Sequence, residues 1–390
     1  MDLMASLTAS DDDYSGGFSN IGQICNPILS RVDDATGNEA TKKKIKCEAL
    51  VLRAYMEYIM VNKFAKAYNA ATASTDPGIA YLTEDADISQ MQPKLSVQEV
   101  YDHILADVNE AIEIDGLPDV AINKLRLSKP CAFAVKALAL MSMQKQDEAE
   151  SAAKQALAIN GTVLNYSTVL GTATGYILGG TYTVLAKPEH YYDEDYYVPT
   201  PDYIYLENVT PEAQARFEKG NMFLKYMGTM NMMYDYAMDY TGTNLGLPGY
   251  VTFYDFDSYW NRYGLNAPQM YFIVAEAEID RGDFNAAMDA LDKVRACRID
   301  PSVYAPLKGT VTTKGEAIKH LKQTVHGDCI CTIYNFINRK RWNQLADYKE
   351  TYTKTINGTV YTLAPDSPMW IFPFPKNVTA VNTNMTQNYK

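Results

Sequence analysis

The sequence has no hydrophobic run long enough to cross a membrane. A spanning helix needs about 20 consecutive apolar residues, and the most apolar stretches of this chain are interrupted by Arg53, Glu57 and Lys136. The first residues also lack the basic start and apolar core of a signal peptide, because an acidic run at 11–13 follows soon after the initial Met. The sequence alone therefore predicts either a cytoplasmic chain or a chain whose leader has been removed.

Positive charge is also scarce. Lys and Arg number 35 against 47 Asp and Glu, which gives a formal net charge of −12. This charge would repel a polyanion, so we expect no nucleic-acid partner. Hydrophobic residues at 47% and charged residues at 21% are close to globular averages, which excludes a disordered or fibrous chain.

Motifs typical of catalysis or metal binding are missing. The sequence has 4 His and 6 Cys, and the Cys have neither a C-x-x-C motif nor a spacing suited to zinc. It contains no nucleophile elbow, phosphate-binding loop, dinucleotide fingerprint or H-E-x-x-H motif. We therefore predict no enzyme, no cofactor and no metal. A glycosidase would need only two facing carboxylates, and a sequence neither shows nor excludes such a pair.

Tyrosine, in contrast, is abundant, with 30 residues against 12 Phe and 3 Trp. Its ring joins an apolar face to a polar tip, which suits surfaces that bind a hydrated ligand. Of the 30 tyrosines, 17 lie between Tyr166 and Tyr263, among many Gly, Thr and Pro residues. We interpret this region as a loop-rich layer with short strands and one helix at about 211–240.

Apolar residues recur at helical spacing elsewhere. The segment 38–68 has one apolar face, and Ser96 and Glu99 form a capping box that predicts the start of the next helix. Two alanine-rich helical hairpins are predicted at 130–160 and 268–298. Small residues at equivalent positions of both hairpins resemble the close helix pairs of tetratricopeptide repeats, although an ordinary helical bundle could share this pattern.

These features predict a single, mainly α-helical domain over residues 1–390. We expect a scaffold of tetratricopeptide-like helix pairs at 17–160 and 265–345, and an irregular, tyrosine-rich ligand-binding subdomain at 161–264. The final segment, 346–390, is punctuated by proline and is expected to wrap around the outside.

Four stretches resemble, in order, motifs of the SusD/RagB-like outer-membrane nutrient-binding lipoproteins of starch-utilisation systems. Residues 48–55 are similar to the family's E-A-x-x-L-R-A-Y helix, and residues 96–101 to its next helix. The third stretch, 264–298, contains the A-E-A helix and its glycine turn. The fourth, 361–375, carries the proline-rich signature and is followed by Gln387-Asn388, similar to the terminal Q-N of the family.

Two departures from the family pattern concern the ends of this scaffold. The sequence has no lipobox Cys at its start, so the lipid anchor that the resemblance implies would lie outside it. The helix at 337–345 keeps Arg341, Trp342 and Leu345 but has Asn343 where the family has an acidic residue. Because that helix is interpreted as structural, the change puts local packing in doubt more than function.

The resemblance implies a non-enzymatic cell-surface lipoprotein of the outer membrane that binds a glycan. It further implies delivery of this oligosaccharide to a TonB-dependent SusC-like transporter as partner. Two alternatives stay open: peptide capture, as in the RagB branch, and a scaffold or lid subunit of the transporter complex without a ligand of its own.

In glycan-binding relatives the site is formed by loops that correspond to 69–95 and 236–263 here. Sugars stack on aromatic rings and need planar or charged partners for their hydroxyls. On this chemistry we predict stacking by Tyr81, Tyr254, Tyr259 and Trp260, and hydroxyl binding by Asn69, Asp76 and Asp257. For any single Tyr, the alternative is that its ring packs the loop layer onto the helices.

Overall fold

The chain divides into two compact units. The terminal unit comprises the chain up to Ala156 together with Ile337–Lys390, and the central unit comprises Leu157–Phe336. The computed structural model describes residues 13–87, 89–174, 181–185, 188–190, 192–199, 206–223, 251–254, 261–356 and 358–388. Within these ranges, no helix has the length and apolar character needed to span a bilayer.

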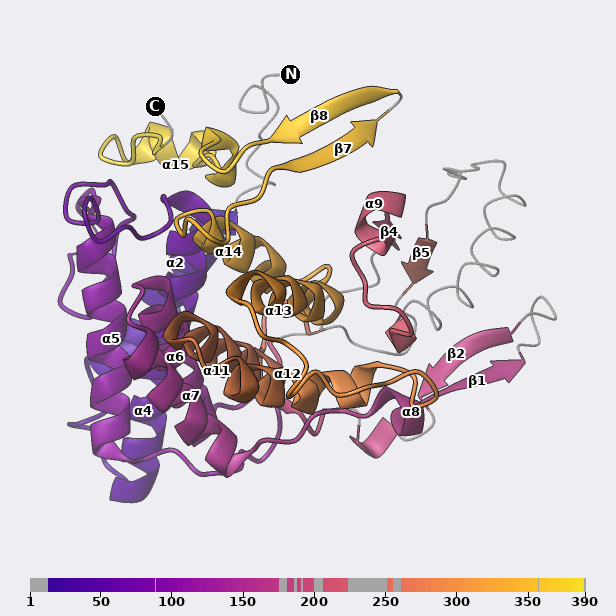
Figure 1. Ribbon diagram of the computed structural model, residues 1–390. Coiled ribbons are helices and arrows are strands. Elements are labelled where there is room, and N and C mark those ends of the chain that lie inside the picture. The colour runs from indigo at the N-terminus through magenta and orange to yellow at the C-terminus, as the bar shows by residue number, and fades with distance from the viewer. Residues whose placement is uncertain are drawn as a thin grey trace. The chain divides into compact units, whose positions relative to one another are not determined.

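Two long helices of the terminal unit lie side by side (Figure 1). α4 (Glu39–Phe64) begins at Asn38, whose side chain caps the first turn. α5 (Val97–Ile114) begins with the capping box of Ser96 and Glu99. Both helical predictions are confirmed, and the box fixes the point at which the preceding loop ends.

The segment before α4 is helical but irregular. α2 (Asp13–Asn20) continues through one π-helical turn at Ile21–Cys25 into the short α3 (Asn26–Leu29). Pro27 lies in the first turn of α3, where an amide N–H would have no partner within that helix.

The two alanine-rich hairpins form as predicted, which confirms the mainly α-helical fold class. Their helices are α6 (Lys129–Ser142) with α7 (Gln146–Ile159), and α11 (Ala267–Arg281) with α12 (Phe284–Arg298). Gly282 ends α11 with φ 89°, a left-handed conformation that glycine adopts without strain. Ala137 and Ala275 are 0% exposed, so these equivalent small residues lie at buried helix contacts.

The rest of the central unit combines a longer helix with short helices and short strand pairs. It contains α8 (Tyr166–Val169), α9 (Pro211–Gln214), α13 (Lys314–Cys329) and the antiparallel strand pairs β1–β2 (Leu170–Thr174, Thr181–Leu185), β3–β6 (Asp195–Tyr197, Leu265–Asn266) and β4–β5 (Leu206–Val209, Val251–Tyr254). The helix expected at about 211–240 is wrong for its first part. α9 ends at Gln214, and turns lead to Gly220, whose φ of 84° is incompatible with a right-handed helix. Residues 224–250 lie outside the described ranges.

The last segment of the chain packs onto α4. Its elements are α14 (Ile333–Trp342), the hairpin β7–β8 (Tyr352–Ile356, Thr359–Leu363), a 3₁₀ turn at Pro368–Trp370 and α15 (Lys376–Val381). Phe374 is 0% exposed, and its ring stacks on Phe64 with centroids 5.3 Å apart. The Phe372 amide donates to the Lys63 carbonyl at 2.8 Å. The segment therefore contributes to the core next to the end of α4.

Candidate ligand-binding site

A pocket of about 460 Å³ opens in the terminal unit, beside the C-terminal end of α4. It is lined by the loop that follows α4 and by the segment after β8. One side chain of α14 and one that follows this helix complete the lining. The lining residues belong to 66–76, Lys340, Gln344, 365–371 and Asn388. Parts of the chain far apart in sequence therefore form one cavity.

Asn69 starts the turn that shapes the loop wall of the pocket. Its Oδ1 accepts the Ala71 amide at 3.0 Å, and its backbone carbonyl accepts the amides of Thr72 and Ala73 at 2.9 and 2.7 Å. This arrangement is an Asx turn, in which a short side chain replaces a backbone hydrogen-bond partner. The Nδ2 of Asn69 lies 3.3 Å from Gln344 Oε1, so two amide groups meet across the pocket.

Asp76 supplies a carboxylate that is held from two sides. Lys66 Nζ lies 2.6 Å from Oδ1, and the Thr72 hydroxyl donates to Oδ2 at 2.5 Å. The Asp76 side chain is 10% exposed and the Lys66 side chain 50%, so the ion pair has its acidic member buried and its basic member toward solvent. The ion pair fixes the carboxylate and leaves the ammonium accessible to a ligand.

The segment after β8 contributes an indole ring to the pocket. Trp370 is 6% exposed, its Nε1 donates to the Ala364 carbonyl at 2.9 Å, and its ring meets Tyr352 edge to face at 5.9 Å. Asp366, in the same segment, is exposed. Because its N–H is already bonded, the indole offers the pocket mainly apolar surface.

Lys340 is a buried amine that also lines this pocket. It is 3% exposed, and its Nζ donates to the carbonyls of Asn62, at 2.6 Å, and of Ala65. These carbonyls belong to the last turn of α4, where cations are favoured by the helix dipole. Burial lowers the pKa of Lys340 to about 7. The lysine therefore holds the end of α4 from which the pocket loop departs.

The chemistry of the pocket is that of hydrogen bonding to a polar ligand. Its lining residues include amides, hydroxyls, carboxylates and an indole, but neither His nor Cys. Across the described ranges, no group of three or more His, Cys, Asp or Glu side chains is placed to hold a metal ion. Planar amides and carboxylates can each bind two neighbouring hydroxyls, and aromatic surface can cover the apolar face of a sugar ring.

The structure brings Asn69 and Asp76 together in this pocket. Tyr81 lies elsewhere: it is 7% exposed, its hydroxyl donates to Asp107 Oδ2 at 2.6 Å, and its ring stacks on His103 at 4.8 Å. The Tyr81 ring therefore packs its loop onto a helix, which is the alternative to sugar stacking given in the sequence analysis. The backbone of Tyr254 lies in β5, but its side chain is outside the description. Asp257, Tyr259 and Trp260 are outside the described residues and stay predictions.

Sequence reasoning missed Gln344 and Trp370. Gln344 lies in the helix at 337–345, which is interpreted from the sequence as structural, and Trp370 lies in the segment that is expected to wrap around the outside. Asn69 and Gln344 are separated by 275 positions, and no local periodicity indicates that such residues meet. The feature of the sequence that could have indicated Trp370 is its position among several prolines, which is typical of a loop.

A buried ionic network holds the second half of the loop that follows α4. Arg53 of α4 is 3% exposed, and its guanidinium forms two bonds of 2.7 Å to Asp107 of α5. It also donates to Asn26 at 2.9 Å and to Glu84 at 2.6 Å. Because Asn26 in turn donates to the carbonyls of residues 82 and 83 at 3.0 Å, the family-motif arginine anchors this loop to both helices.

Glu57 lies in the same core region and is 0% exposed. Neither of its carboxylate oxygens meets the geometry of a hydrogen bond with any described group. Burial raises the pKa of Glu57 well above its usual range, and the Leu82 backbone and Arg53 oppose this only in part. The core therefore favours the neutral acid.

Glu57→Gln is expected to flatten the pH dependence of stability. Above about pH 4.5 the unfolded chain loses the Glu57 proton, whereas the folded chain keeps it. The wild-type free energy of unfolding therefore falls as the pH rises towards the raised folded pKa, by up to ~1.4 kcal/mol per pH unit. Urea unfolding at several pH values measures this, with exposed Glu113→Gln as control. A constant difference between Glu57→Gln and wild type across the range would contradict it.

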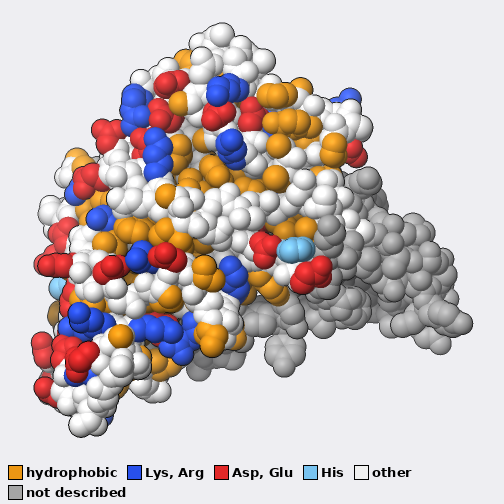
Figure 2. Space-filling view, turned by 90° about the horizontal axis from the view of Figure 1, so that it is seen from below, with side chains coloured by type: hydrophobic (Ala, Val, Ile, Leu, Met, Phe, Trp, Pro, Cys, Tyr) orange, Lys and Arg blue, Asp and Glu red, His pale blue; other side chains and the backbone are white. Residues whose placement is uncertain are grey.

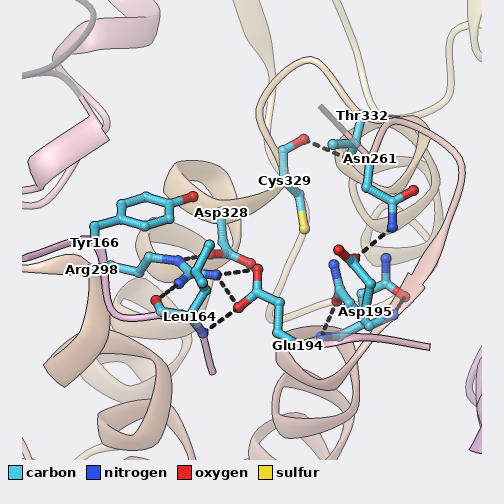
Figure 3. A pocket seen from close by; sticks show the side chains of 11 residues that line it. Leu164, Tyr166, Glu194, Asp195, Asn261, Arg298, Asp328, Cys329 and Thr332 are labelled. Atoms are coloured by element: carbon cyan, nitrogen blue, oxygen red, sulfur yellow. Dashed lines mark hydrogen bonds and ion pairs between the residues drawn. The ribbon is translucent and has the colours of Figure 1, made fainter. Parts of the chain in front are cut away.

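A second, smaller cavity of about 50 Å³ lies in the central unit (Figure 3). Arg298 crosses it, with Nη2 2.8 Å from Glu194 Oε2 and Nε 2.5 Å from Asp328 Oδ1. The guanidinium also lies 4.3 Å from the centre of the Tyr166 ring, and the Leu164 amide donates to Glu194 at 2.7 Å. These groups satisfy one another, and the cavity has room for water rather than for a sugar, so we interpret it as structural.

The surface drawn in Figure 2 mixes charges of both signs. Lys and Arg side chains alternate with Asp and Glu, and hydrophobic side chains lie between them. On the described part of this face, basic side chains form no continuous surface of the kind a polyanion needs.

Known proteins resemble this chain in sequence and in fold. Residues 8–140 match a SusD-like family described as starch-binding and associating with the outer membrane. A SusD superfamily protein from Bacteroides thetaiotaomicron is similar with a TM-score of 0.66 at 14% identity, over 96% of this chain and 84% of its own. Surface glycan-binding protein A from Bacteroides uniformis gives 0.65 at 13%, over 97% and 85%. A SusD-like carbohydrate-binding protein from Bacteroides vulgatus gives 0.62 at 15%, over 95% and 83%. No curated protein matches the sequence.

At these identities the solved structures establish the fold, which is the helical SusD-like fold over nearly the whole chain. The family match over residues 8–140 adds a likeness in sequence. Together they confirm the resemblance found in the motifs: residues 8–140 match the SusD-like family in sequence, and the chain has the SusD-like fold.

Proposed function

We propose that this protein captures a glycan in the pocket of the terminal unit and makes or breaks no covalent bond. The observation that carries the proposal is the grouping of the Asn69 and Gln344 amides, the Asp76 carboxylate and the Trp370 indole around one cavity. The SusD-like family supports carbohydrate binding, and a protein named for surface glycan binding has the same fold.

The contacts of the two pocket carboxylates support binding rather than hydrolysis. A glycosidase needs one carboxylic acid that keeps its proton and one carboxylate on the other side of the bond. Both oxygens of Asp76 are already bonded within the loop, one to the Lys66 ammonium and the other to the Thr72 hydroxyl, and Asp366 is exposed. This arrangement suits a carboxylate that holds the loop and binds hydroxyls rather than one that attacks a glycosidic bond.

We further propose that the protein acts at the outer membrane, held by an N-terminal lipid anchor, and passes its ligand to a SusC-like TonB-dependent transporter. The description of the matching family as associating with the outer membrane supports this location. Co-purification of a TonB-dependent barrel with the tagged protein from solubilised outer membranes would test the partnership.

Substituting the pocket residues is expected to weaken glycan binding. Asp76→Ala removes a charged acceptor, and such bonds contribute about 1.5–3 kcal/mol, so we expect an affinity loss of roughly 10-fold to 100-fold. Asn69→Ala removes a neutral partner, and a loss of about 3-fold to 10-fold is expected. Isothermal calorimetry against a panel of oligosaccharides that includes maltoheptaose measures both.

Asn123→Ala is the matched control for Asn69→Ala. Its side chain also caps a turn, with Oδ1 accepting the Leu125 amide at 3.0 Å, but it lies outside the pocket. Binding of peptides in place of every sugar would favour peptide capture, and binding of neither would favour a scaffold without a ligand. Turnover of a chromogenic glycoside would contradict the non-enzymatic role.

A further inference from the structure

The side-chain amide of Asn388 joins the two ends of the pocket loop. Its Nδ2 donates to the carbonyl of Phe64 at 2.6 Å and to that of Gly78 at 2.8 Å. Phe64 is the last residue of α4, and Gly78 follows Asp76 by two positions. The stretch between them, 65–77, contains all the loop residues that line the pocket. One NH₂ group therefore uses its two protons to close this loop.

Other contacts hold Asn388 in place. Lys94 Nζ donates to Asn388 Oδ1 at 2.8 Å, and to the carbonyl and hydroxyl of Thr386 at 2.7 and 2.8 Å. The neighbouring Gln387 exchanges two bonds with the backbone of Phe374, at 2.8 and 2.9 Å. Asn388 is 4% exposed, so its amide is shielded from competing water.

Gly78 packs closely against the backbone at Leu95 and Ser96. Its amide donates to the Leu95 carbonyl at 2.8 Å, and a Cβ at this position would lie 2.9 Å from that same oxygen. The backbone on one side and the Asn388 amide on the other therefore fix the point where the loop returns.

We propose that Asn388 is a positioning residue of the pocket. Together with Gln387 it forms a latch that keeps loop 65–77 in the conformation that binds ligand. The motif match gave this Gln-Asn pair no role. This inference rests on the proposed function for its effect on affinity, but not for its effect on the loop. Without the amide, the carbonyls of Phe64 and Gly78 lose their donors while buried, so the loop is driven toward conformations that expose them to water.

Hydrogen exchange of the ligand-free protein tests the latch directly. Asn388→Ala is expected to speed exchange at least 10-fold for the amides of residues 71–76, and to leave a peptide from α12 unchanged. Asn382→Ala is the matched control, because its amide also reaches from the chain's last segment to a backbone carbonyl, that of Gln92, at 3.0 Å. Lys94→Met removes the bond to Asn388 Oδ1 and the two bonds to Thr386 but leaves the Asn388 amide in place, so a smaller increase is expected in the same peptide.

Calorimetry with an oligosaccharide that the wild type binds supplies the second readout, in which Asn388→Ala should weaken affinity at least 10-fold. Unchanged exchange at 71–76 in Asn388→Ala overturns the latch, and so does faster exchange spread equally over the terminal unit in both Asn388→Ala and Lys94→Met. If the wild type binds no sugar, the proposed function fails, while the exchange result still decides the latch.

Discussion

Replacing Arg298 with Met is expected to destabilise the central unit by about 3–5 kcal/mol. The Arg298 side chain is 5% exposed, and those of Glu194 and Asp328 are 11% and 6% exposed. Removing the guanidinium would leave two carboxylates buried together without a counter-charge. Burial raises the pKa of Glu194, and Arg298 opposes this rise, so the variant is expected to take up a proton on folding.

The same substitution also removes the contact of the guanidinium with the Tyr166 ring and its bond to the Leu164 carbonyl. Differential scanning calorimetry would follow the loss as a lower Tm of the central unit. The control is Arg298→Met combined with Glu194→Gln and Asp328→Asn, which removes all three charges and should recover much of the loss. A single variant as stable as the wild type would show that the ion pairs contribute little.

Arg53→Met is expected to cost a similar ~3–5 kcal/mol in the terminal unit. Two bonds of 2.7 Å join the guanidinium to Asp107, and Asp107 also accepts the Tyr81 hydroxyl. Without the arginine, this carboxylate would stay buried with one neutral donor. The loop carrying Glu84 would lose its charged attachment as well, so faster proteolysis around residues 79–87 should accompany the lower stability.

Arg53→Lys separates charge from geometry in this network. Lysine keeps the positive charge but presents no planar fork to Asp107, so a cost between those of wild type and Arg53→Met is expected. Chemical unfolding would measure all three proteins. Equal stability of the Lys and Met variants would mean that the charge itself contributes nothing, contrary to the role assigned to the ion pair.

Local patterns in the sequence predict most of the helical scaffold. The periodicity of 38–68 and the Ser96–Glu99 box are properties of neighbouring residues, and α4 and α5 follow from them within a few positions. The expected helix at about 211–240 fails where Gly220 takes a positive φ. A backbone turn of this kind depends on one residue, which an average over a window conceals.

The site was predictable only in part, because the chemistry of a side chain does not show whether the fold exposes it to a ligand or buries it. Asn69 and Asp76 were chosen for their hydrogen-bonding groups on a loop, and they line one pocket. Tyr81 was chosen by the same reasoning, yet its hydroxyl is bound to a buried carboxylate. The sequence cannot distinguish these outcomes, since the partner of the Tyr81 hydroxyl, Asp107, lies on α5. The residues that complete the pocket are also distant in sequence.

That distance in sequence has a consequence for the order of events during synthesis. The carbonyl of Gly78 and the amide of Asn388 are 310 positions apart, and the whole central unit is translated between them. At about 5–20 residues per second, a ribosome needs roughly 15–60 s to cover this distance. During that interval the loop after α4 lacks the Asn388 amide, although α4 and α5 can already pair. A nascent chain that stops before residue 388 would therefore carry the paired helices α4 and α5 and an unfinished pocket.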